Sequence, residues 1–119
     1  MVPPVPFFYN SDASEHLHKG GRIVVYFIVT IYTDKNQGRG AYDEYIQEVR
    51  PLVEAYGGTY IVRSDNVTPL DERWKPARVI VIEWESRRDL ERCLKSEAYK
   101  KIVSKRENSV DSRAVIVEG

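Results

Sequence analysis

Two segments of the chain are apolar on both alternating faces, which is the pattern of strands covered on two sides. In residues 22–33, five successive odd-numbered positions are aliphatic or aromatic, and the even-numbered positions between them are also largely apolar. Residues 78–85 repeat the pattern around an uninterrupted Val-Ile-Val-Ile core. Strands of this kind lie in the middle of a sheet. The pattern therefore predicts two central strands, with less apolar strands at 59–64 and 113–118.

Between the strands, apolar residues recur at steps of three and four, which is the period of a helix. The clearest stripe runs through 41–56, and its members are Tyr42, Tyr45, Ile46, Val49, Leu52, Val53 and Tyr56. Pro51 lies inside this stripe, so a kink or a break is expected there, because proline lacks the backbone donor. The glycine pair at 57–58 is expected to end the helix. A second helix should follow Ser86, with a further helical piece after Ser96.

The resulting order, strand-helix-strand-strand-helix-strand, is that of a ferredoxin-like α+β fold. Such a chain forms a four-stranded antiparallel sheet with two helices on one face, and its first and third strands are central. These are the strands that the apolar pattern places in the middle, so pattern and topology agree. We expect residues 22–119 to form one such domain. Residues 1–21 carry three prolines, a glycine pair and no periodicity, and are expected to be a tail or linker.

Two helices cover only one face of such a sheet, and the other face is predicted to be apolar as well. It would present Ile28, together with Ile80 or its neighbours. Monomeric proteins rarely expose an apolar patch larger than a few hundred Å². We therefore expect a homodimer that packs its two sheets face to face, in the arrangement of a dimeric α/β barrel.

Charge and composition exclude several classes of partner. Lys plus Arg and Asp plus Glu each number 18, and this net charge of zero argues against nucleic-acid binding. The longest apolar run, about nine residues at 23–31, is too short for a membrane span. Cys93 is the only cysteine, so no disulfide forms within the chain, and its helical stripe predicts a buried thiol. The N-terminus lacks the pattern of a signal peptide, and a cytoplasmic location is expected.

The same strand order also builds RNA-recognition domains, whose central strands carry exposed aromatic and basic residues. The third strand here reads Arg-Val-Ile-Val-Ile-Glu-Trp from residue 78 and lacks that aromatic set. His16 and His18 are the only histidines and lie in the predicted tail, so the domain itself offers no imidazole base or haem ligand. We expect no metal and no cofactor.

The candidate ligand-binding residues are arginines and tyrosines that border the apolar segments. They are Arg63, Tyr26, Tyr45, Tyr99 and Arg106. A guanidinium can hold a carboxylate or an enolate through two hydrogen bonds, and a phenol can donate to an oxyanion. The alternatives are an ion pair of Arg63 with Glu83 or Glu85, and core tyrosines whose hydroxyls lie at the rim. The sequence identifies no catalytic residue.

An ordered set of residues between 22 and 119 matches the pattern of a known family. Its members are Tyr26, Tyr42, Tyr45, Pro51, the run 56–63, Trp74, Pro76, Arg78, the run 96–99, Arg106, Glu118 and Gly119. This set resembles the DUF1330 family, a domain of unknown function. Two departures are visible, because Ser-Asp replaces a glycine pair after Arg63 and the loop before the first helix is longer.

The resemblance implies a dimeric α/β barrel, a group that includes cofactor-free monooxygenases, haem-degrading enzymes, isomerases and dehalogenases. We therefore expect a small-molecule-binding protein, with the chemistry of a cofactor-independent enzyme acting on a small carbonyl or carboxylate compound. The alternatives are a non-enzymatic dimeric module, for binding or for structure, and a ligand-sensing regulatory domain. Cavity size discriminates between them, since an active site needs a cavity of roughly 300 Å³ or more.

Overall fold

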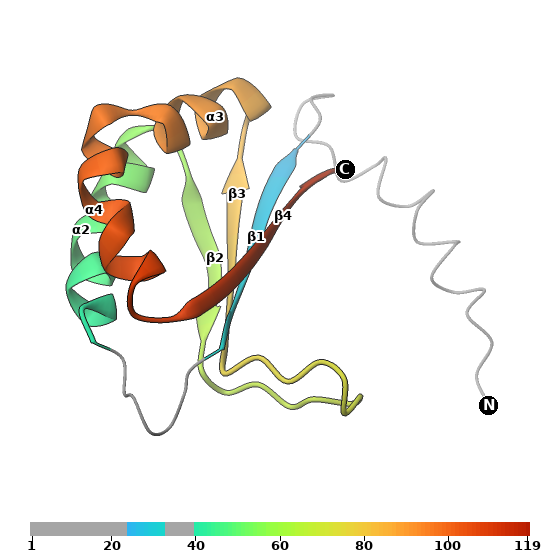
Figure 1. Cartoon of the computed structure of the whole chain (residues 1–119). Coiled ribbons are helices and arrows are strands. Elements are labelled where there is room, and N and C mark those ends of the chain that lie inside the picture. The colour runs from blue at the N-terminus through green and yellow to red at the C-terminus, as the bar shows by residue number, and fades with distance from the viewer. Residues whose placement is uncertain (1–23, 33–39) are drawn as a thin grey trace.

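Helices and strands follow the predicted order in the computed structural model, which describes residues 24–32 and 40–119. The elements are β1 (Val25–Tyr32), α2 (Tyr42–Ala55), β2 (Thr59–Ser64), β3 (Arg78–Trp84), α3 (Arg87–Lys95), α4 (Glu97–Glu107) and β4 (Asp111–Glu118). The strands form one antiparallel sheet in the order β2-β3-β1-β4, so the central position predicted for the first and third strands is confirmed. The helices lie together on one face of this sheet (Figure 1). The predicted ferredoxin-like α+β fold is confirmed.

The predicted second helical unit consists of two helices, α3 and α4, which share Ser96 as a boundary. The Ser96 backbone is extended, with φ −69° and ψ 151°, and its hydroxyl accepts a hydrogen bond from the Tyr99 backbone N at 3.1 Å. Ser86 caps α3 in the same way, through the backbone N of Asp89 at 3.1 Å. Each serine satisfies a backbone donor that a helix start leaves open. Within the described ranges, three helices rather than two therefore cover the sheet.

The end of α2 is set by glycine and not by proline. The helix continues through Pro51 to Ala55, so the proline does not break it. Gly57 has a φ of +98°, a conformation that favours glycine, and its backbone N donates to Glu54 O at 3.1 Å. Gly58 N donates to Val53 O at 3.0 Å, which closes the last turn. The predicted stop at this glycine pair is confirmed.

Gly58 also lets the end of α2 lie directly against the core. A methyl group at residue 58 would lie 2.6 Å from Val53 Cγ1 and 2.8 Å from Trp84 Cζ2, and Trp84 is almost fully buried. We therefore expect Gly58→Ala to lower the free energy of unfolding by roughly 1–3 kcal/mol, as overpacked cores do. Urea denaturation measures this change. In a Val53→Ala background the same substitution should cost less, and an equal cost would contradict the steric explanation.

The two faces of the sheet differ in what covers them. Ile28 on β1 points away from the helices, next to Val81 and Val115 on the neighbouring strands. Ile80 lies instead on the helix side, because its partner in the register is Val29, which lines the cavity described below. The neighbours of Ile80 on β3 therefore face outward with Ile28. The exposed apolar side chains of this open face are Val62, Val115 and Val117, with 43, 56 and 42% exposure.

The described residues include no helix that is both long enough and apolar enough to cross a bilayer. The predicted tail at 1–21, with His16 and His18, lies outside the described residues, and so does most of the loop before α2. The predicted boundary at residue 22 therefore stays a prediction.

Candidate functional site

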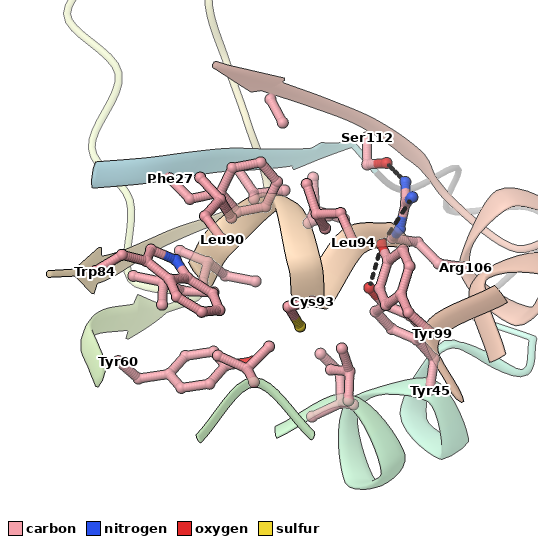
Figure 2. Close-up of a pocket in the computed structure, with 18 of the residues that line it drawn as sticks. Phe27, Tyr45, Tyr60, Trp84, Leu90, Cys93, Leu94, Tyr99, Arg106 and Ser112 are labelled. Carbon is pink, nitrogen blue, oxygen red and sulfur yellow. Dashed lines mark hydrogen bonds between the residues drawn. The ribbon is translucent and has the colours of Figure 1, made fainter. Parts of the chain in front are cut away.

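A cavity of about 100 Å³ lies between the sheet and the helices (Figure 2). Every strand and helix of the described chain contributes at least one side chain to its wall. Most of this wall is aliphatic or aromatic, with Phe27 from β1, Val49 from α2 and Leu90 from α3 among its members. An apolar cavity with a few polar groups is the usual composition of a small-molecule site.

One end of the cavity is polar, because two tyrosines and an arginine meet there. The hydroxyl groups of Tyr45 and Tyr99 lie 3.1 Å apart, within hydrogen-bonding distance. Arg106 Nη2 donates to the Tyr99 hydroxyl at 3.3 Å, and Arg106 Nη1 donates to Ser112 Oγ. The Arg106 guanidinium also lies over the Tyr45 ring, 5.7 Å from its centroid. Figure 2 shows these side chains meeting at one end of the cavity, and we call the four residues the Tyr–Arg cluster.

Local sequence explains how three elements bring the Tyr–Arg cluster together. Tyr45 lies in the first turn of α2, on the apolar stripe that faces the sheet. Tyr99 lies in the first turn of α4, which the Ser96 cap fixes, and Arg106 follows seven residues later on the same helix face. Ser112 lies on β4 opposite Ile31, so its side chain points to the helix side. The cluster therefore depends on two helix starts and one strand register.

The aromatic end of α2 extends the cluster toward the sheet. The rings of Tyr42 and Tyr45 stack at a centroid separation of 6.1 Å and an interplanar angle of 26°. The guanidinium of Arg78, at the start of β3, lies 5.8 Å from the Tyr42 ring centroid. Two arginines thus lie on the faces of two stacked tyrosines, an arrangement that cation–π attraction stabilises.

Burial and mutual contacts determine the protonation states of Tyr45 and Arg106. Burial raises the pKa of Tyr45 well above its ordinary value, the neighbouring Tyr99 raises it further, and Arg106 only partly opposes this. Burial alone would lower the pKa of Arg106, but its contacts with Tyr99 and Tyr45 outweigh that effect and the net shift is upward. At neutral pH, Tyr45 is therefore an uncharged phenol and Arg106 a cation. Both act as hydrogen-bond donors, and Tyr45 is not a general base.

The opposite end of the cavity carries Tyr60 and Trp84, and Cys93 lies between the two ends (Figure 2). Burial raises the pKa of Tyr60 to about 12 and the pKa of the Cys93 thiol to about 11. Cys93 is fully buried, as predicted, and a thiol of this pKa is a poor nucleophile. Trp84 Nε1 is buried and has no hydrogen-bond partner within the described part of the chain. An unsatisfied buried donor of this kind is destabilising by about 1–3 kcal/mol.

The structure brings three of the five candidate residues together and separates the other two. Tyr45, Tyr99 and Arg106 meet in the Tyr–Arg cluster. Tyr26 lies on the open face of the sheet, opposite Glu83 and Val117 in the register, and therefore away from the cavity. Arg63 is exposed at the end of β2 and does not line the cavity. Its guanidinium lies 5.7 Å from the centroid of the Tyr60 ring.

Ser112 and Tyr60 are among the lining residues that the sequence did not identify. The last strand was predicted to begin at residue 113 but begins at Asp111, so Ser112 lies on this strand. Tyr60 lies on a short strand whose side-chain directions the sequence pattern does not determine. In the structure, Tyr60 pairs with Ile82 on the central strand β3, and this register turns its ring toward the cavity. Among the described residues, no group of three or more His, Cys, Asp or Glu side chains is placed to hold a metal ion.

The fold and the cavity define a ferredoxin-like α+β domain whose internal site has an arginine–tyrosine end. The family model of the domain of unknown function DUF1330 matches residues 24–119. The chain therefore belongs to the DUF1330 family, and the resemblance seen in the sequence is confirmed. No curated protein matches the chain.

Several solved structures share this fold. A protein of unknown function from Rhodopseudomonas palustris superposes with a TM-score of 0.66 at 18% identity, over 99% of this chain and 95% of that one. A nipsnap family protein of unknown function from Agrobacterium tumefaciens gives 0.56 at 11% identity, over 86% and 92%. A proposed antibiotic biosynthesis monooxygenase from Nitrosomonas europaea gives 0.54 at 14% identity, over 82% and 90%. At these identities the similarity establishes the fold alone.

Proposed function

We propose that this protein binds a small carbonyl or carboxylate compound in its cavity, with Arg106, Tyr99 and Tyr45 as the anchor for the ligand oxygen. The observation that carries the proposal is the Tyr–Arg cluster, in which a half-buried guanidinium and two phenol hydroxyls meet at the end of an apolar cavity. Such groups recognise an acceptor oxygen and favour a negative one. Trp84, whose N–H has no hydrogen-bond partner among the described residues, adds a further donor to the wall.

The size of the cavity restricts the ligand. Its volume of about 100 Å³ is well below the roughly 300 Å³ expected for a typical active site. An engineered cavity of about 150 Å³ holds benzene, so this one suits a compound of about six non-hydrogen atoms or fewer. This size supports binding of a short acid or ketone and counts against the bulky polycyclic substrates that a larger cavity would admit.

The chemistry that the cavity supports is polarisation of a carbonyl group. Arg106 and the phenol of Tyr99 would stabilise the negative oxygen of an enolate, and the α-proton would pass to water, because the described lining residues include no carboxylate, imidazole or amine. With that role, the protein would be a cofactor-independent enzyme of the monooxygenase- or isomerase-like kind. A non-enzymatic binding module is the alternative, and the small volume of the cavity favours it. Exchange of the α-protons of a bound ketone with deuterium, measured by NMR, distinguishes the two functions. An enzyme accelerates this exchange, and a binding module does not.

Removal of the arginine charge tests the anchor. We expect Arg106→Met to weaken the binding of pyruvate and acetate by about 10-fold or more, because a hydrogen bond to a charged group contributes roughly 1.5–3 kcal/mol. Titrations followed by ¹H–¹⁵N NMR measure the affinity.

Arg63→Met is the matched control for this experiment. Arg63 is an exposed arginine outside the cavity, so its loss should leave both affinities unchanged. Tyr99→Phe should weaken binding by a smaller factor than Arg106→Met, since a neutral hydrogen bond contributes less than a charged one. If Arg63→Met weakens binding and Arg106→Met does not, Arg63 is the anchor and the proposed site is wrong.

We also propose that two copies of the chain associate through the open face of the sheet. The observation that supports this is the row of exposed valines on that face, Val62, Val115 and Val117, beside Ile28. A contiguous apolar surface of this kind is typical of an interface. Sedimentation velocity of the full chain tests the association, and a monomer at all accessible concentrations would refute it.

A further inference from the structure

A long connection between β2 and β3 extends away from the body of the domain. We call residues 65–77 the β2–β3 arm. Figure 1 shows this arm projecting on the side of the sheet that the helices leave uncovered. A connection of this length without a helix or strand is uncommon between neighbouring antiparallel strands, and such loops are usually functional.

The arm has a defined shape because its base and its tip are held by polar contacts. Arg78 forms a two-point hydrogen-bonded ion pair with Asp65 across the base. The backbone N of Ala77 donates to Ile31 O at 2.7 Å, which ties the returning chain to β1. At the tip, the Asp71 carboxylate accepts hydrogen bonds from the backbone N and the guanidinium of Arg73 at 2.7–3.0 Å. The backbone of the arm is therefore held at its base and at its tip.

The arm presents large apolar side chains to solvent. Leu70 is 99% exposed and Trp74 is 60% exposed. The charged residues of the arm are paired, Asp71 with Arg73, Glu72 with Lys75 and Asp65 with Arg78 at the base, so they leave no surplus charge to attract an acidic or basic partner. An exposed tryptophan on a segment whose backbone is held is typical of an interface residue that becomes buried on association. The recognition chemistry of the arm is therefore apolar.

We propose that the β2–β3 arm is a clasp that packs Leu70 and Trp74 onto a second copy of this chain. The inference rests on the proposed homodimer and adds an element to it. The arm and the open face lie on the same side of the sheet, so a copy seated on that face meets the arm. Two-fold symmetry then lets each arm grip the other copy, and both apolar surfaces are buried at once.

The two tryptophans provide a direct test, because one is on the arm and the other is in the core. Trp84 is 1% exposed and Trp74 is 60% exposed. In the wild-type dimer, iodide should quench Trp74 fluorescence several-fold less than in the monomeric Ile28→Asp variant. Trp74→Phe supplies the Trp84 background for both measurements. A monomer whose Trp74 is already protected would show that the chain covers its own arm, and would overturn the clasp.

A pair of arm variants separates the clasp from the dimer itself. The double variant Leu70→Ser/Trp74→Ser should have a dimer dissociation constant about 10-fold or more above that of the wild type, because it removes two interface anchors. Thr68→Ala, an exposed position on the same arm, should leave it unchanged. If Ile28→Asp dissociates the dimer while the double arm variant keeps the wild-type constant, the clasp is refuted and the dimer stands. If the wild-type chain is a monomer throughout, the proposed dimer fails first and the clasp fails with it.

Discussion

Replacement of Ile28 by aspartate is expected to convert the proposed dimer into a folded monomer. Ile28 lies on the open face of the central strand β1, between Val81 and Val115. In a two-fold dimer each copy brings one such carboxylate, because a symmetric interface uses the same patch twice. An unpaired buried charge is destabilising by several kcal/mol, so the two together should weaken association by about 1,000-fold or more. Sedimentation velocity over a wide range of protein concentration measures the change.

A matched control places the same charge where no partner is proposed. Ala98 is exposed on α4, on the helix side of the domain, and Ala98→Asp should leave the dimer intact. Far-UV circular dichroism of Ile28→Asp should match the wild type, because residue 28 is accessible to water in the separate chain. An Ile28→Asp protein that sediments like the wild-type dimer would show that the interface lies on another face.

The fold could be predicted from the sequence because the two central strands are apolar on both alternating faces. That pattern is typical of strands in the middle of a sheet, and the structure places β1 and β3 in the middle. The division of the second helical unit is a finer feature that depends on Ser96. Serine signals a helix start, but the sequence alone does not show that the preceding helix ends at the same residue.

The candidate site was predicted only where helices carry it. Tyr45 and Tyr99 lie on helical stripes, whose apolar side identifies the face that meets the sheet. Tyr26 lies on a strand that is apolar in both directions, so the pattern does not show which face its ring takes. The case of Arg63 is different, because the register shift between Tyr60 and Val62 places it opposite Ile80, on the helix side. Its strand β2 is at the edge of the sheet, and Arg63 is exposed there and lies outside the cavity. Such irregularities reverse the side-chain alternation and leave no clear mark in the sequence.

Raising the pH above about 10 is expected to unfold the protein progressively, because buried phenols resist ionisation. Tyr45 has its pKa raised far above its ordinary value of about 10, chiefly by burial, and burial raises the pKa of Tyr60 to about 12. The unfolded chain therefore releases these protons at a lower pH than the folded chain. The folded state binds more protons above pH 10, so its stability falls as the pH rises, by about 1.4 kcal/mol per pH unit for Tyr45.

The buried thiol of Cys93 acts in the same direction, since burial raises its pKa to about 11 from an ordinary value of about 9. Urea denaturation at a series of alkaline pH values measures the combined slope, and absorbance at 295 nm follows the tyrosinates directly.

Tyr45→Phe isolates the contribution of the phenol in the Tyr–Arg cluster. Phenylalanine has no proton to release, so the free energy of unfolding should fall less steeply above pH 10 in this variant. At neutral pH the same change should be destabilising by only about 1 kcal/mol, since it removes one neutral hydrogen bond to Tyr99. The wild type should therefore be the more stable protein at neutral pH, and the two stability curves should converge and then cross as the pH rises. Parallel curves for the two proteins would mean that Tyr45 ionises as easily in the folded chain as in the unfolded one, and the cluster would then be open to water and not the desolvated anchor proposed for the ligand.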